Sequence, residues 1–109
     1  MAHEGYHESA ANLRPETQDL HRAIVSLMEE LEAIDWYQQR VDACQDPELQ
    51  AILAHNRDEE KEHAAMLIEW LRRRDARFDK ELRDYLFTDK PLATLEQAHA
   101  GKGKDDAAV

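Results

Sequence analysis

The sequence predicts an all-α fold built from two long antiparallel helices and a short C-terminal helix. The 109 residues include only three glycines and three prolines, so few positions interrupt a helix. Hydrophobic residues make up 42% of the chain, and they recur at helical spacing over two long stretches without Gly or Pro in their interior. A single cysteine, Cys44, excludes a disulfide framework or a thiolate-rich metal site within one chain.

The first long helix is expected over about residues 15–43. Pro15 suits the first helical position, and Glu16 follows where a carboxylate complements the helix dipole. Apolar residues at heptad spacing form one seam, Leu20, Ile24, Leu27, Leu31, Ile34 and Val41. A second stripe at steps of four and three contains an acid, and it reads Ala23, Leu27, Glu30, Ile34, Tyr37 and Val41. Heptad spacing predicts a helix that packs nearly parallel or antiparallel to another.

The second long helix is expected to begin at Asp46 or Pro47, because Asp is a favourable N-cap and Pro a favourable first residue. It extends to about Arg74, with a seam of Leu49, Leu53, Asn56, Glu60, His63, Leu67 and Trp70. The short connection between the helices predicts an antiparallel hairpin. Asp75 suits the N-cap of a short third helix that ends near residue 87. The helical domain is thus placed at residues 15–87, with a disordered N-terminus at 1–14 and a flexible, at most weakly helical tail at 88–109.

The charge balance narrows the classes of partner. Asp and Glu total 24 against 14 Lys and Arg, giving a formal net charge of −10. Nucleic acids and anionic membrane surfaces repel such a chain, so we expect neither as a partner. No apolar run approaches the roughly 20 residues that span a bilayer. The charge favours metal cations or a cationic partner surface, and the low cysteine content is typical of the reducing cytoplasm.

Polar residues interrupt the seam of the second helix at Asn56, Glu60 and His63. Glu60 and His63 are three residues apart and therefore share one helix face, the Glu-x-x-His spacing of carboxylate di-metal bundles. In a hairpin that turns near residue 45, Glu30 and Glu60 each lie 15 residues from the turn, at the same height. The alternative is a rotated helix on which these polar side chains are solvated.

One chain supplies half of the ligands that such a bundle requires, namely one Glu and one Glu-x-x-His pair. A lone hairpin also cannot bury its large apolar residues together, Leu27, Ile34, Trp36, Tyr37, Leu67 and Trp70. Both arguments predict a homodimer that forms a four-helix bundle. Two copies of Glu30 and Glu60 carry four negative charges, which balance two divalent ions. Carboxylate and imidazole ligands suit iron, manganese or zinc.

Two stretches closely resemble the encapsulated ferritins: residues 28–37, MEELEAIDWY, and residues 54–66, AHNRDEEKEHAAM. The resemblance covers about residues 16–87, including the turn at residues 46–49. Members of that family are half-ferritins that oxidise Fe(II) for storage. They build the ferroxidase site across a dimer interface, assemble into a ring-shaped decamer and are cargo of encapsulin shells.

The resemblance implies a di-iron site of Glu30, Glu60, His63 and Tyr37, with two Fe per dimer interface. It also implies an outer site, formed by Glu29 and Glu32 beside Trp36, through which metal enters. The implied partners are a second copy of the chain, an encapsulin shell protein, Fe(II) and O2, and the implied location is inside an encapsulin nanocompartment in the cytoplasm. The tail departs from the family pattern, since it ends GKGKDDAAV without an apolar-then-basic targeting segment.

Two other functions stay open from the residues themselves. The first is a non-enzymatic helical assembly protein in which Glu60 and His63 hold a structural metal. The second is a di-iron oxidoreductase, although a short hairpin leaves little room for an organic substrate. A haemerythrin-like oxygen carrier ranks low, because His21, His55 and His63 are too few helical histidines.

Overall fold

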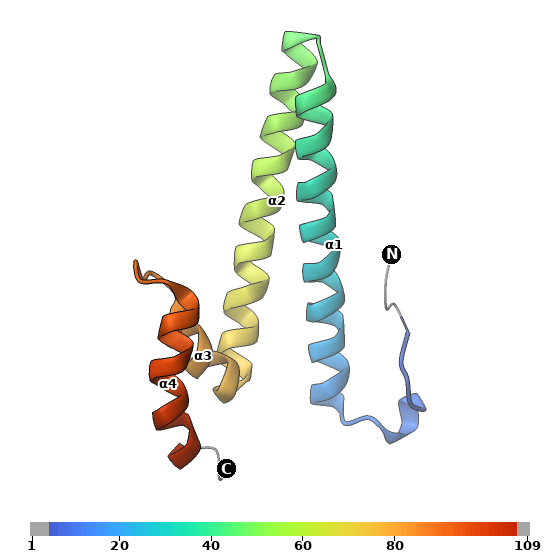
Figure 1. The fold of residues 1–109 in the computed structure, drawn as a ribbon. Coiled ribbons are helices and arrows are strands. Elements are labelled where there is room, and N and C mark those ends of the chain that lie inside the picture. The colour runs from blue at the N-terminus through green and yellow to red at the C-terminus, as the bar shows by residue number, and fades with distance from the viewer. Residues whose placement is uncertain (1–4, 107–109) are drawn as a thin grey trace. The chain divides into compact units, whose positions relative to one another are not determined.

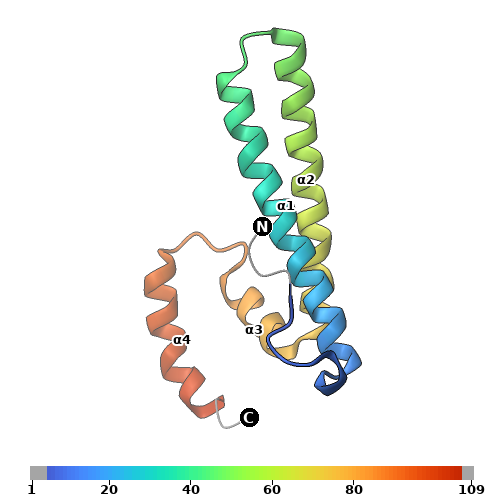
Figure 2. The same ribbon diagram turned by 90° about the vertical axis from the view of Figure 1, so that its right-hand side faces the viewer.

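The computed structural model describes residues 5–106, and these contain helices and no β-strand (Figure 1). A 3-10 turn at Ala10–Asn12 precedes four helices, α1 (Pro15–Ala43), α2 (Pro47–Arg74), α3 (Ala76–Tyr85) and α4 (Leu92–Asp106). Both views show α1 and α2 side by side as an antiparallel hairpin (Figures 1 and 2). The all-α class and the limits of both long helices are confirmed. No described helix is long and apolar enough to cross a membrane.

Local capping explains where the hairpin turns. The Asp46 carboxylate accepts a hydrogen bond of 2.8 Å from the backbone N–H of Leu49, as expected for the N-cap of α2. The Gln50 side chain donates to the carbonyl oxygens of Val41, at 2.7 Å, and Cys44, at 3.3 Å. These carbonyls lie at the C-terminal end of α1, where no following turn of the helix supplies N–H donors. The first turn of α2 therefore caps the last turn of α1.

The hairpin has a thin core. The chain divides into two compact units at Leu71 and Arg72, and within the first unit only Ala23, Ala64 and Leu71 are buried among the described residues. Ala23 belongs to the stripe that contains Glu30, so this stripe faces α2. Ile24 and Leu31 of the heptad seam are instead exposed, by 46% and 52%. The stripe that contains Ala23 and Glu30 therefore makes the intrachain contact, and the seam residues Ile24 and Leu31 lie outside it.

Large apolar side chains remain exposed along the hairpin. Those on α1 and α2 are Ile24, Leu31, Trp36, Leu49, Ile52 and Met66. Of the six large side chains that one hairpin was expected not to bury together, Trp36 is exposed and the other five are half-buried.

The segment before α1 is tied to that helix. The Gln18 side chain donates to the carbonyl oxygens of Ala10, at 3.2 Å, and Leu13, at 3.4 Å. The rings of Tyr6 and His21 lie 4.7 Å apart between centroids. Residues 5–14, within the segment expected to be disordered, thus have defined contacts that hydropathy patterning does not report. Residues 1–4 of that segment lie outside the described residues.

The second unit begins at Arg72 and includes α3 and α4. Asp75 caps α3 as expected, its side chain accepting a hydrogen bond of 2.9 Å from the backbone N–H of Phe78. Phe87, just after α3, has a φ of 61°, the left-handed conformation in which helices often end. The structure then forms α4 within the segment expected to be a flexible tail, and residues 107–109 of that tail lie outside the described part of the chain.

Candidate metal centre

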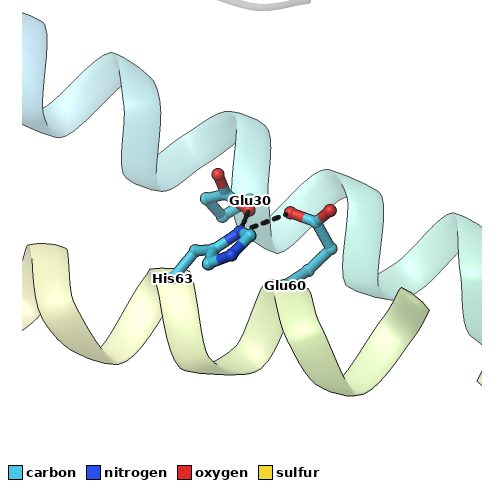
Figure 3. Close-up of side chains that lie close together, drawn as sticks. All are labelled: Glu30, Glu60 and His63. Atoms are coloured by element: carbon cyan, nitrogen blue, oxygen red, sulfur yellow. Dashed lines mark ion pairs between the residues drawn. The ribbon is translucent and has the colours of Figure 1, made fainter. Parts of the chain in front are cut away.

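Three of the predicted ligands converge between α1 and α2 (Figure 3). Glu30 of α1 and Glu60 and His63 of α2 each offer a ligand atom, and these atoms lie within 4.8 Å of one another. Nδ1 of His63 is 3.5 Å from Oε2 of Glu30 and 3.4 Å from Oε2 of Glu60. Within residues 5–99, whose side chains the structure describes, no other group of three or more Asp, Glu, His or Cys side chains converges in this way. We call Glu30, Glu60 and His63 the ligand cluster.

The ligand cluster is partly withdrawn from solvent. The side chains of Glu30 and Glu60 are 23% and 24% exposed, and that of His63 is 42% exposed. Oε2 of Glu30 is itself buried and makes no hydrogen bond. An unsatisfied carboxylate oxygen costs free energy, and a cation held between the two carboxylates removes that cost. The donor set of two carboxylates and one imidazole therefore fits a divalent metal ion.

The cluster follows from helix geometry. Glu60 and His63 are one turn apart on α2, so both project toward α1. The antiparallel course of α1 and α2 places Glu30 at the same height along the hairpin. The carboxylates repel each other without a cation between them, so a cation bound there would stabilise this arrangement.

The other three predicted site residues lie outside the ligand cluster. Glu29 is exposed, and Glu32 and Tyr37 are half-buried, all on α1. The ring of Tyr37 is contacted by Arg40, whose guanidinium carbon is 5.2 Å from the ring centroid. Their roles in metal entry and ligand orientation remain predictions.

An apolar groove of about 520 Å³ begins at the ligand cluster. It runs between the N-terminal half of α1 and the C-terminal half of α2. Its lining residues are Asp19, Arg22, Ala23, Ser26, His63, Met66, Leu67 and Trp70. His63 thus borders both the ligand cluster and exposed apolar surface, including Met66, which is 58% exposed.

A polar link between the two helices, which hydropathy patterning does not reveal, lies one turn from Glu60. Nη1 of Arg57 donates to Oε1 of Gln38 across the hairpin at 2.8 Å. Arg57 precedes Glu60 by three residues and Gln38 follows Tyr37 directly. In the sequence, Arg57 is a cation beside the polar residues that interrupt the seam of α2. Its partner, however, depends on the register of the folded helices.

A helical hairpin carrying paired carboxylates and a Glu-x-x-His pair defines the class of half-bundle, ferritin-like proteins. The EncFtn-like family model matches residues 5–89, and this chain belongs to that family.

The named relatives agree with this family assignment. The chain is similar to an encapsulated ferritin-like protein from Rhodospirillum rubrum, with 65% identity over 98 residues, which cover 89% of this chain and 70% of the relative. It is also similar to a ferritin-like protein from Thermotoga maritima, with 52% identity over 96 residues, covering 88% of this chain and 84% of the relative. The crystal structure of protein ne0167 from Nitrosomonas europaea matches with a TM-score of 0.79 and 71% identity. That match covers 82% of this chain and 98% of the other. The resemblance to encapsulated ferritins is therefore confirmed.

Proposed function

We propose that this protein is a ferroxidase that oxidises Fe(II) with O2 at a di-iron site formed by two copies of the chain. The observation that carries the proposal is the convergence of Glu30, Glu60 and His63, with Oε2 of Glu30 buried and unsatisfied. Membership of the EncFtn-like family supports an iron-related role for this cluster.

Two copies are required because one chain holds half of a di-iron ligand set. Bundles of this type take a Glu from each of two helices and a Glu-x-x-His pair from each of the other two. One hairpin contributes one of each. The apolar groove that begins at His63 supports association on this face, since exposed Met66 continues the apolar surface beside the ligands. The proposed assembly is a homodimer within a ring-shaped decamer.

In the proposed reaction, each of two Fe(II) ions gives up one electron, and O2 accepts the pair with two protons to form hydrogen peroxide. The carboxylates of Glu30 and Glu60 stabilise the Fe(III) product more than Fe(II), because their attraction grows with the charge of the ion. Nδ1 of His63 supplies a neutral donor that fixes the position of the ion. Glu29 and Glu32 attract Fe(II) on the outer face of α1, and Tyr37 orients a ligand by hydrogen bonding.

We further propose that this reaction feeds iron storage inside an encapsulin shell. The name of the Rhodospirillum rubrum relative, an encapsulated ferritin-like protein, supports this location. A hairpin of this size encloses no storage cavity, so the Fe(III) product must leave the protein.

The test is aerobic oxidation of Fe(II), followed by absorbance, with native mass measured on the same samples. Wild type is compared with Glu60→Ala and with Glu62→Ala, an exposed carboxylate on the same helix outside the cluster. We expect fast oxidation by wild type and Glu62→Ala, on a dimer or larger ring, and only the buffer rate with Glu60→Ala.

Oxidation at the buffer rate by all three proteins would contradict the proposal. If metal still binds to wild type in that case, the cluster is a structural metal site in an assembly protein, which the exposed apolar surface also suits. Oxidation of an organic substrate instead of Fe(II) would indicate a di-iron oxidoreductase.

A further inference from the structure

Arg57 is a long cationic side chain held in place between the two hairpin helices. Its side chain is 19% exposed, which is low for an arginine on a two-helix hairpin. Nη1 donates to Oε1 of Gln38 at 2.8 Å, while Nε donates to Oδ1 of Asp58 at 3.0 Å. The Arg57 guanidinium also holds the pKa of the Asp58 carboxyl below its usual range. Two N–H donors of the planar guanidinium are thus held at once, Nη1 by Gln38 of α1 and Nε by Asp58 of α2.

The direction of the side chains explains why Arg57 and Gln38 meet. Side chains lean toward the N-terminus of their own helix. Arg57 therefore leans toward the hairpin turn, and Gln38 leans away from it, so the two converge from opposite directions. The amide of Gln38 is fixed in turn, because its Nε2 donates to Oδ1 of Asp42 at 2.9 Å.

This link is close to the ligand cluster. Arg57 is one turn before Glu60 on α2, and Gln38 is eight residues after Glu30 on α1, a rise of about 12 Å along the helix. Among the described residues, the buried core of this unit consists of Ala23, Ala64 and Leu71, whose apolar contacts are non-directional. Such contacts tolerate sliding or rotation of one helix against the other, whereas metal ligands must be placed to within about 0.5 Å.

We infer that Arg57, fixed by Gln38, is a positioning residue that sets the register of α2 against α1 and so brings Glu60 and His63 to Glu30. The inference rests on the proposed function, since it concerns the same ligand cluster. Arg57 itself does not touch the metal.

The charge of Arg57 and its positioning role predict opposite changes in metal affinity when the side chain is replaced. A cation one turn from Glu60 repels a divalent ion, so removing it by charge alone should tighten metal binding. Loss of positioning should weaken binding instead, because residues that orient metal ligands typically contribute 10- to 100-fold in affinity. The sign of the change in Arg57→Met, a side chain of similar length without donors, therefore separates the two accounts.

Gln38 and Gln39 give a matched pair of variants. Both are exposed on α1, and both donate from Nε2 to a carboxylate four residues away, Gln38 to Asp42 and Gln39 to Asp35. Gln38 alone of the two accepts from Arg57. Replacing either by Leu removes a similar bond within α1, and only Gln38→Leu breaks the link across the hairpin.

The experiment is anaerobic titration with Co(II), which reports affinity and, through its visible spectrum, the coordination of the ion. We expect Gln38→Leu and Arg57→Met to bind Co(II) about tenfold more weakly than wild type, with altered spectra. Gln39→Leu should match wild type in both. Arg57→Lys keeps the charge but not the planar fork, so it should recover only part of the affinity. Circular dichroism on each sample measures folding separately.

Two results overturn the inference, and they are distinguishable from failure of the proposed function. Wild-type affinity and spectrum in Gln38→Leu, or tighter binding in Arg57→Met, contradicts the positioning role alone. Equal Co(II) binding by wild type and Glu60→Ala contradicts the ligand cluster, and the inference fails with it. Should Gln38→Leu fail to fold, the Arg57→Lys and Arg57→Met pair decides the question.

Discussion

Nδ1 of His63 lies 3.5 Å from Oε2 of Glu30. This contact joins two long helices at a point far from their connecting turn. The same Oε2 atom is buried and has no hydrogen-bond donor. The contact is therefore too long to satisfy the carboxylate, yet close enough for one metal ion to lie between the two side chains. In the proposed function, this is the point at which a metal ion would bridge the two helices.

Glu30→Gln should weaken metal binding with little change of shape, because it removes the charge and keeps the size of the side chain. We expect at least a tenfold loss of Fe(II) or Co(II) affinity, equivalent to about 1.4 kcal/mol. Without metal, the variant should be as stable as wild type or more stable, since a repulsion between two carboxylates is relieved. Calorimetric titration under anaerobic conditions measures the affinity. Glu62→Gln serves as the control, and equal affinities for the two variants would contradict the ligand role of Glu30.

A bound divalent metal should stabilise the fold. An ion that binds the folded state alone contributes about 2.7 kcal/mol when its free concentration is one hundred times its Kd. We expect Co(II) to raise the denaturation midpoint of wild type and a chelator to reverse the shift. The same ion should leave the midpoint of Glu60→Ala nearly unchanged. A rise of equal size in both proteins would show that the ion acts elsewhere.

The Asp46 carboxylate should contribute to stability through the N-cap of α2. Asp46→Ala removes the acceptor for the Leu49 N–H and should cost about 1 kcal/mol of unfolding free energy. Asp46→Asn keeps a side-chain acceptor and should cost much less. Denaturant unfolding of metal-free protein measures both variants. Equal losses in the two would mean that the charge of Asp46, and not the cap, stabilises the turn.

Acid should loosen the second unit through Asp79. The guanidinium of Arg72, together with that of Arg83, holds the pKa of the Asp79 carboxyl below its ordinary value of 3.8. A carboxyl whose pKa is lowered by folding stabilises the fold above its unfolded pKa, and this contribution is lost as pH falls through the folded pKa. We expect the helical signal of α3 to decrease below about pH 3.8, and the decrease to be smaller in Asp79→Asn. Nuclear magnetic resonance of the α3 amides across this range tests the expectation.

Local chemistry is why the helix limits were predictable from the sequence. Pro15, Pro47 and the caps Asp46 and Asp75 act within one turn of themselves, so their effect does not depend on distant residues. The same locality explains the pairing of Glu60 with His63, since a spacing of three residues fixes both on one helix face. Their convergence with Glu30 also followed from counting residues on either side of the turn.

The tertiary structure decided which face of α1 meets α2. Two stripes on α1 share Leu27, Ile34 and Val41, so hydropathy alone does not choose between them. The small side chain of Ala23 allows close approach of the helices, and this places its stripe inside while Ile24 and Leu31 face outward. The contact of Tyr6 with His21 is likewise between rings 15 residues apart, beyond any local pattern.

The sequence by itself thus determined the helices, their limits and which acidic and histidine side chains converge, because capping, helical spacing and a short turn are local constraints. Folding decided the rotation of α1 about its axis and the link from Arg57 to Gln38, because both depend on how side chains of different helices fill the space between them.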